Sequence, residues 1–374
     1  MTELFAGESM VHDDGYPMLV RYFPSAAREK STTGRPLVVF FPGWAHLGRI
    51  AYGYPGCTEE HFLAPWITRL GYPFLATSYP LAHPVFDRPY PAFGLRDWGA
   101  CAAAACERII GTEGLSRRVI GVSWSAAGQV IRPFNVACRN RGIEVCFHLA
   151  IEGTPALVLP PDRTGGITKT AAGLVSIHQS HYPLFRAEIA EMEALEGTAI
   201  LPDKEHLAHL WGDFPVGLAG TLERFRNGGF RVDATAALED KGFFQFAEYP
   251  LVAAISGTSR VAPYHPLVDR ATWSFLAARA LFHGGLADRA GALAQLSADR
   301  FEALARLFDD LPRRLHVRLP GNHFLFLGRR GARATSEALA AFAVEIERLK
   351  TDLASILVHS SGSFDPFHMA SGLP

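Results

Sequence analysis

Apolar runs and amphipathic stretches alternate along the first part of the chain. The run LVVFFP at residues 37–42 lies between Pro36 and Gly43, which is typical of a strand buried on both faces of a parallel sheet. Similar runs predict strands at 73–77, 119–122 and 144–151, and helical periodicity predicts helices at 58–70 and 97–110. Strands that alternate with helices in this way predict an α/β fold, with a mostly parallel central sheet flanked by helices.

The alternation stops after Ile151. Residues 155–245 contain helical stretches separated by loops rich in Gly, Pro and Asp. Apolar strands reappear at 251–255 and 315–319, helices are expected at 273–282 and 298–311, and apolar three- and four-residue steps from Leu339 to Ile356 predict a last helix. The predicted organisation is therefore a core of residues 1–154 and 246–358, a helical insertion at 155–245 and a flexible tail at 359–374.

The insertion, of about 90 residues, is too long for an ordinary connection within a sheet. It follows the carboxyl end of a predicted strand, and ligands of open α/β sheets bind at such ends. We therefore expect the insertion to form a lid over a ligand site. The alternative is that it only adds packing.

Composition narrows the class of protein. The 374 residues carry 36 basic and 37 acidic side chains, so no basic surplus favours nucleic acid or an anionic membrane. The sequence has no apolar stretch of about 18 residues, so we expect no membrane span. Its five cysteines form no Cys-x-x-Cys pair, and the first residues lack a signal-peptide pattern. We expect a cytoplasmic protein without a metal site or cofactor.

The stretch VIGVSWSAAGQVI at 119–131 carries the most informative motif. A predicted strand runs into a serine flanked by small residues and then into a helix, as in a nucleophile elbow. With Ser125 as nucleophile, Ala127 and Gly128 allow the helix to begin close to the strand. With Ser123 instead, Gly121 lies two residues before it and the pattern is Gly-x-Ser-x-Ser. We favour Ser125, and Ser123 stays open.

A base and an acid should accompany the serine. His323 follows the last predicted strand within LHVRLPGNHFLFLG, from where it could reach the serine across the sheet. Glu152 directly follows the strand at 144–151 and is the favoured acid, with Asp269 and Asp162 as substitutes. The loop ISGTSRVAP, another place for the acid, has Arg260 instead. Three further histidines near predicted strand ends stay open as alternatives: His46, His148 and His265.

An oxyanion hole requires two backbone N–H groups beside the nucleophile. We expect one from Ala126 and the other from Trp44, because Gly43 lets the chain turn after the strand at 37–42. Gly43, Trp124 and Trp211 are the expected substrate contacts.

Four segments in order, LVVFFPGW, VSWSAAG, IEGTPALVL and LPGNHFLFL, resemble the α/β-hydrolase superfamily. More narrowly, the chain resembles the thioesterase domains of fatty acid, polyketide and nonribosomal peptide synthases, which often carry their acid in a D-G-x-P-like setting; here Glu152 replaces the aspartate. The resemblance implies that Ser125 is acylated, that Glu152 orients His323, and that water or an internal nucleophile releases the acyl group. Ser123 and Ala127 stand where glycines are usual.

The expected function is hydrolysis of an acyl thioester or ester by a serine hydrolase. Its substrate would be a small molecule with an apolar acyl group, including one linked to a carrier protein or to coenzyme A. The alternatives are a carboxylesterase, an acyltransferase or cyclase on the same three residues, and a non-catalytic binding protein of this fold. Arg260, in a common acid position, keeps the last alternative open.

Overall fold

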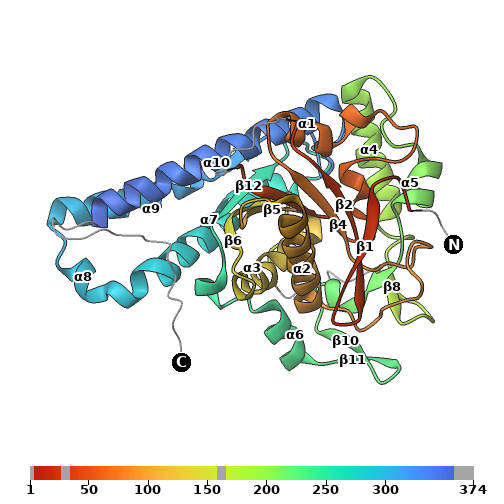
Figure 1. Ribbon diagram of the computed structural model, residues 1–374, viewed down its shortest axis with the longest axis horizontal. Helices are drawn as coiled ribbons and strands as arrows, with labels where there is room; N and C mark the ends of the chain where they lie inside the picture. Colours follow the sequence, from red (N-terminus) through yellow and green to blue (C-terminus); the bar gives the residue numbers. More distant parts are fainter. Residues whose placement is uncertain (1–3, 27–33, 158–165, 358–374) are drawn as a thin grey trace.

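The computed structural model describes residues 4–26, 34–157 and 166–357 (Figure 1). At its centre is an eight-stranded sheet in the order β1-β2-β4-β3-β5-β6-β12-β13. The strands from β3 onward pair in parallel, and β2 joins the edge of β4 in antiparallel orientation. The bounds are β1 Glu8–Asp13, β2 Tyr16–Phe23, β3 Leu37–Phe41, β4 Phe74–Ser78, β5 Arg118–Trp124, β6 Glu144–Ile151, β12 Val252–Ser256 and β13 His316–Arg318.

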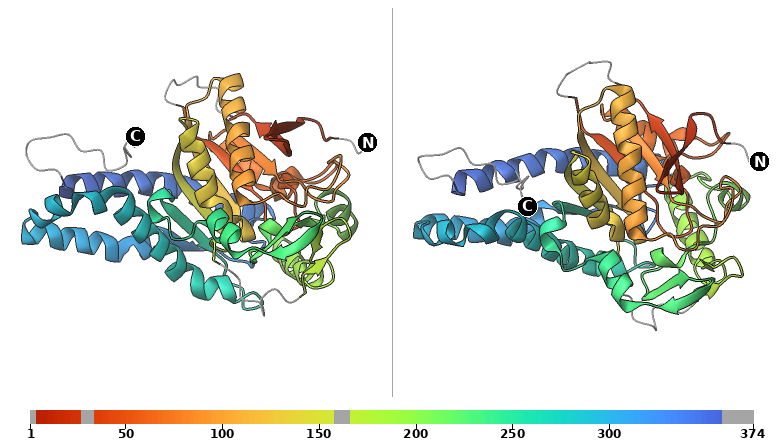
Figure 2. Two further views of the ribbon diagram at one scale, coloured as in Figure 1. Left: turned by 90° about the horizontal axis from the view of Figure 1, so that it is seen from below. Right: turned by 60° about the horizontal axis from the view of Figure 1, so that its bottom comes forward.

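Helices cover both faces of the sheet (Figures 1 and 2). Side chains of α2 (Leu95–Glu113) and α3 (Ile131–Asn140) share one hydrophobic core with Phe41. Those of α1 (Leu63–Arg69) and α10 (Arg329–Leu357) share the other with Phe40. Because successive strand residues point to opposite faces, the adjacent Phe40 and Phe41 enter different cores. This layered architecture confirms the predicted α/β class and mostly parallel sheet.

The hairpin β1–β2 is an element that the apolar pattern does not predict. Its turn is formed by Asp14 and Gly15, both with positive φ (46° and 81°). A short Asp-Gly connection of this kind suits the twist of antiparallel strands. The hairpin extends the sheet at the edge away from β5 and β6.

The segment 155–245, where described, combines helices with short strands. The helices are α4 (Tyr182–Glu196), α5 (Asp203–His209) and α6 (Ala234–Lys241), and the strands are β7 (Thr168–Lys169), β8 (Leu174–Ser176), β9 (Phe214–Pro215), β10 (Glu223–Arg226) and β11 (Gly229–Val232). The strands form two small sheets of their own and none joins the central sheet. Their lengths of two to four residues explain why no apolar alternation signals them.

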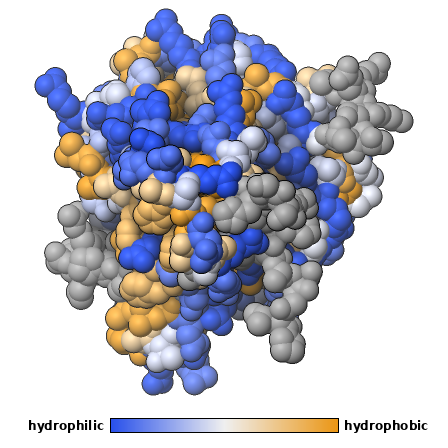
Figure 3. All heavy atoms as spheres, turned by 90° about the vertical axis from the view of Figure 1, so that its left-hand side faces the viewer, coloured by the Kyte–Doolittle hydropathy of each residue, from blue (hydrophilic) through white to orange (hydrophobic). Residues whose placement is uncertain are grey.

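The remaining helices form an arm that projects beyond the sheet (Figure 2). It contains α7 (Tyr264–Leu281), the π-helical turn η7 (Phe282–Leu286), the 3-10 turn η8 (Ala287–Arg289), α8 (Ala290–Ala294) and α9 (Ala298–Arg314). Arg314 at the end of α9 lies 2.8 Å from Asp352 of α10. Figure 3 looks at the projecting end, where hydrophobic areas lie beside hydrophilic ones. The tail expected at 359–374 lies outside the described residues.

Candidate active site

Ser125 lies on a sharp turn at the carboxyl end of the sheet. It follows the last residue of β5 and begins the 3-10 turn η3 (Ser125–Val130), and its φ of 58° is left-handed. A Cβ on Gly128 would lie 2.4 Å from the carbonyl oxygen of Thr154, so only glycine allows the chain after Ser125 to pack so closely on this loop. This is the geometry of a nucleophile elbow, in which the strained turn presents the hydroxyl at the sheet edge.

Ser123, the alternative nucleophile, lies within β5 and pairs with Phe41 and Ala150 on the neighbouring strands. Its side chain is fully buried, and its hydroxyl has no hydrogen-bond partner among the described residues. Ser125, by contrast, is partly exposed.

His323 reaches Ser125 from the loop after β13. Its Nε2 lies 2.8 Å from Ser125 Oγ, which is hydrogen-bond distance. The indole N–H of Trp124 donates to the carbonyl oxygen of His323 at 2.7 Å. Asn322 donates to Glu191 of α4 at 2.6 Å. The loop that carries His323 is therefore fixed both by the elbow strand and by the segment 155–245.

Glu152 directly follows β6 and is fully buried. Its Oε2 lies 3.7 Å from His323 Nδ1, and its Oε1 accepts a hydrogen bond from the backbone N–H of Gly257. Its φ is also positive, at 44°, so the backbone turns sharply to aim the carboxylate at the histidine. Ser125, His323 and Glu152 are thus brought together from three separate loops.

The surroundings of His323 favour the neutral imidazole. Burial lowers its pKa, the neighbouring Glu152 carboxylate counteracts that effect, and a nearby His265 lowers the pKa further when protonated. A pKa below the ordinary histidine value leaves the ring unprotonated at neutral pH, as a general base requires.

The backbone at Gly43 and Trp44 lies against the serine. A Cβ on Gly43 would come within 2.8 Å of Ser125 Cβ, so the close approach requires glycine. The Tyr79 hydroxyl donates to the Gly43 carbonyl oxygen at 2.7 Å, and His46 Nδ1 lies 2.7 Å from the Trp44 carbonyl oxygen. Since both carbonyls are engaged in this way, the peptide planes of this loop are fixed. Ala126, the other expected oxyanion donor, is buried at the start of η3.

The expected substrate contacts have different positions. Gly43 borders Ser125 directly, whereas Trp124 is 1% exposed and its N–H is engaged by the loop of His323. In this structure Trp124 therefore supports the base instead of lining an open surface. Trp211, just after α5, packs edge-on against His46 with ring centroids 5.2 Å apart. Phe185 of α4 stacks on His323 with ring centroids 6.0 Å apart.

The acid alternatives can also be located. Asp269 lies on α7, where it pairs with His265 at 2.9 Å. Asp162 lies outside the described residues. His148 is buried within β6, and neither of its ring nitrogens has a hydrogen-bond partner among the described residues. His46 packs edge-on against Trp124 with ring centroids 5.0 Å apart, whereas His265 is the histidine alternative whose ring lies beside both Glu152 and His323. Its four-residue spacing from Asp269 is the signal that the sequence offers for this pair.

One group of residues in the described part of the chain has a donor set that a metal could use. A ring nitrogen of His265, one of His323 and a carboxylate oxygen of Glu152 lie within 4.8 Å of one another. Each imidazole already faces a carboxylate, and His323 also faces Ser125. Hydrogen bonding and charge pairing therefore account for this group.

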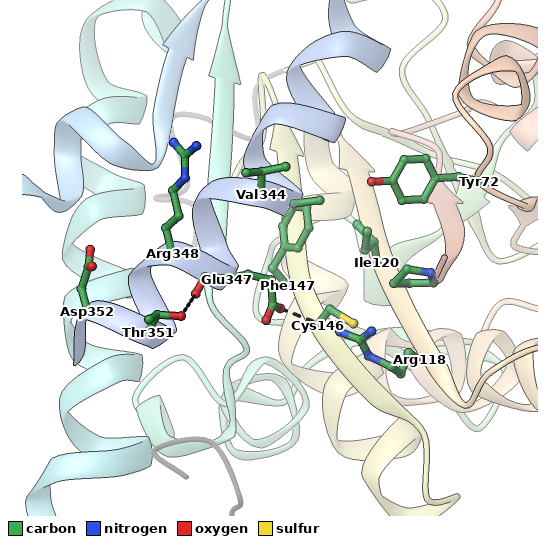
Figure 4. A pocket seen from close by; sticks show the side chains of 12 residues that line it. Tyr72, Arg118, Ile120, Cys146, Phe147, Val344, Glu347, Arg348, Thr351 and Asp352 are labelled. Carbon is green, nitrogen blue, oxygen red and sulfur yellow. Dashed lines mark hydrogen bonds and ion pairs between the residues drawn. The ribbon is translucent and has the colours of Figure 1, made fainter. Parts of the chain in front are cut away.

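A cavity of about 530 Å³ lies at the opposite end of the sheet (Figure 4). Arg118, the first residue of β5, and Cys146 of β6 border it, and α10 closes the other side with Val344, Glu347 and Arg348. Arg118 lies 3.8 Å from Glu347. Because this cavity adjoins the amino ends of the strands, it is separate from Ser125 at their carboxyl ends.

The strand order, the serine elbow after β5 and the histidine loop after the last strand define an α/β-hydrolase fold. Within the described ranges no helix is long and apolar enough to cross a membrane.

Comparison with known proteins adds only distant structural likenesses. No protein-family model and no curated protein matches the sequence. Among solved structures, the thioesterase domain from the curacin biosynthetic pathway is similar at 11% identity and a TM-score of 0.40, covering 90% of this chain and 98% of that one. Est1E from Butyrivibrio proteoclasticus is similar at 12% identity and a TM-score of 0.44, covering 92% of this chain and 100% of that one. The epoxide hydrolase CorEH is similar at 13% identity and a TM-score of 0.46, covering 90% of this chain and 98% of that one. At this level the likeness does not extend to activity or substrate.

Proposed function

We propose that the protein is a serine hydrolase that cleaves an acyl thioester or ester through an acyl-enzyme intermediate on Ser125. The observation that carries the proposal is the 2.8 Å separation of Ser125 Oγ and His323 Nε2. A serine hydroxyl is a weak nucleophile until a base accepts its proton, and this distance allows that transfer. The left-handed turn at Ser125 supports the same assignment.

In the proposed reaction, Ser125 Oγ attacks the acyl carbon while His323 Nε2 accepts its proton. Glu152 orients the imidazole and stabilises its positive form. The N–H groups of Ala126 and Trp44 would stabilise the oxyanion of the tetrahedral intermediate. His323 then returns the proton to the departing thiolate or alkoxide, which leaves as thiol or alcohol. Water, deprotonated by the same histidine, then attacks the acyl-enzyme. The bond between the acyl carbon and Ser125 Oγ breaks, His323 returns the proton to Oγ, and the free acid is released.

The segment 155–245 is proposed to act as a lid over this site. Its α4 contributes Phe185, which stacks on His323, and Phe214 of β9 stacks on Trp44 with ring centroids 5.7 Å apart. Aromatic side chains above the reacting groups favour an apolar acyl chain and exclude bulk water.

The position of the acid supports the thioesterase form of the proposal. Glu152 follows the strand next to the elbow strand, which is the acid position that the resemblance to thioesterase domains implies. On this basis the leaving group is a thiol, carried by coenzyme A or a carrier protein. A simple carboxylesterase is the alternative that an activity screen should include.

The proposal is tested by labelling the purified protein with a fluorophosphonate probe and mapping the modified peptide by mass spectrometry. We expect labelling at Ser125, its loss in Ser125→Ala and His323→Ala, and its retention in Ser123→Ala. Hydrolysis of matched acyl thioesters and esters should fall by several orders of magnitude in Ser125→Ala.

Labelling of Ser123 would move the nucleophile by two residues and refute the assignment. Full turnover by Ser125→Ala would refute it as well. A folded wild-type protein that neither reacts with the probe nor hydrolyses any acyl substrate would instead favour the non-catalytic binding protein.

A further inference from the structure

A second carboxylate–imidazole pair lies directly against the proposed triad. His265 Nδ1 is 2.9 Å from Asp269 Oδ1 and 3.2 Å from Oδ2, and both residues lie on α7, one helical turn apart. Asp269 is 1% exposed and His265 9%. The ring of His265 stacks on that of His323, with centroids 5.3 Å apart and an interplanar angle of 20°. The pair is therefore buried against the proposed base.

Glu152 has one carboxylate oxygen without a conventional hydrogen bond. Its Oε1 accepts from Gly257, but Oε2 is buried and has no hydrogen-bond partner among the described residues. An ionised oxygen in that situation is costly unless a positive or hydrogen-bonding group faces it. A ring nitrogen of His265 and one of His323 both lie within 4.8 Å of a carboxylate oxygen of Glu152. Because Asp269 engages Nδ1 of His265, Nε2 is the ring nitrogen available to interact with Glu152.

We propose that Asp269 and His265 form a positioning pair that holds Glu152 in place and keeps it oriented towards His323. The inference rests on the proposed function, because it assigns a role relative to that triad. In this arrangement Asp269 accepts a hydrogen bond from His265, and the His265 ring lies within 4.8 Å of a Glu152 carboxylate oxygen. Glu152 in turn orients His323 beside Ser125. His265 acts through Glu152 and is not itself in contact with Ser125.

The charges around His265 support this arrangement. Asp269 faces it from α7, Glu152 from the end of β6 and Glu188 from α4, while His323 and the ring of Tyr264 lie beside it. Burial alone would lower the pKa of His265, but the three carboxylates together raise it above the ordinary value. His265 is therefore protonated at a pH where His323, whose pKa is lowered, has already lost its proton.

Two effects of removing the imidazole follow. The Glu152 carboxylate would lose its neighbouring cation, and the triad would lose its fixed geometry. Misplacement of a catalytic group by about 1 Å costs on the order of 100-fold in rate. His323 would also lose a positive neighbour, so its pKa would rise. The acid limb of the profile of kcat/KM against pH follows the deprotonation of the base in the free enzyme, here His323. This limb would therefore move to higher pH.

The test uses His265→Gln and Asp269→Asn in the full chain, with His209→Gln as the matched control. His209 forms a similar pair with Glu205, four residues away on α5 at 3.1 Å, but lies apart from the triad. We expect His265→Gln to lower kcat about 10- to 100-fold with KM little changed, and to move the acid limb to higher pH. Asp269→Asn should act in the same direction with a smaller shift. His209→Gln should leave both unchanged.

An unmoved acid limb in His265→Gln, with wild-type kcat, would overturn the inference while Ser125 labelling left the proposed function intact. Loss of labelling in the wild type would overturn the proposed function itself. If a variant does not fold, titration of the wild-type histidines by NMR decides the matter. His265 should retain its second proton to higher pH than His323, and the reverse order would refute the positioning pair.

Discussion

Gly43 lies so close to Ser125 that its lack of a side chain is a condition of the proposed chemistry. A Cβ there would meet Ser125 Cβ at 2.8 Å and Trp124 Cε3 at 3.1 Å, and neither neighbour is the free end of a flexible chain. We expect Gly43→Ala to displace Ser125 from His323 and to slow fluorophosphonate labelling about 100-fold. The stability cost should be only about 1–3 kcal/mol, as for other overpacked sites. Stopped-flow labelling and urea denaturation measure the two quantities.

Gly111→Ala is the control for that substitution. Gly111 is an exposed position of α2 where an added Cβ would meet nothing within 4 Å, so alanine should leave labelling unchanged and slightly favour the helix. Equal labelling rates for Gly43→Ala and Gly111→Ala would contradict the close approach at the elbow.

The candidate triad is the part of the site most accessible from sequence. Ser125 is marked by small neighbours between a strand and a helix, and His323 and Glu152 each follow an apolar strand. The pair His265–Asp269 shows only helical four-residue spacing, which predicts that the two share a face. That this face turns towards Glu152, a residue far from α7 in the chain, depends on how α7 packs against the central sheet. Local pattern carries no information about it.

At the scale of elements, α6 is joined to the elbow by a buried lysine. Lys241 Nζ donates to Gln129 Oε1 at 2.5 Å, and burial lowers the lysine pKa to about 7. Between this value and the ordinary value of 10.5 the unfolded chain binds more protons than the folded one, so stability rises with pH across that window. We therefore expect the difference in free energy of unfolding between the wild type and Lys241→Met to shift in favour of the wild type as the pH rises. The shift should be on the order of 1 kcal/mol per pH unit.

Urea denaturation of both proteins at pH 7, 8 and 9 measures this difference. Lys204→Met, at an exposed position of α5, serves as the control because it removes a lysine side chain that is not buried. Parallel pH dependence of the wild type and Lys241→Met would show that the ammonium is not desolvated.

Elements were predictable where one periodicity persists for several residues. The parallel strands are continuously apolar because both of their faces are buried, and their predicted positions agree with the structure. The last helix is longer than predicted: α10 begins at Arg329, and its first turns have few large apolar residues to mark them. The strands of the segment 155–245 are too short for an alternating pattern, and only their mutual pairing defines them.

At the scale of the whole molecule, the central sheet separates two hydrophobic cores. Each core contains free cysteines, whose reactivity measures how well that core is packed. Cys101, Cys106 and Cys138 belong to the core under α2 and α3, and Cys146 belongs to the core under α10. All four are buried, and burial raises each of their pKa values. Cys57 is the partly exposed thiol, and no pair of the five is bonded.

Thiol titration therefore tests the packing of both faces at once. With Ellman's reagent at pH 8 we expect at most one fast-reacting thiol, Cys57, in the native protein and five in guanidinium without reductant. The buried thiols should react only through opening of the structure, and mass spectrometry of partly labelled protein resolves the two faces. More than one fast thiol, or fewer than five after unfolding, would contradict the two packed cores or the absence of disulfides.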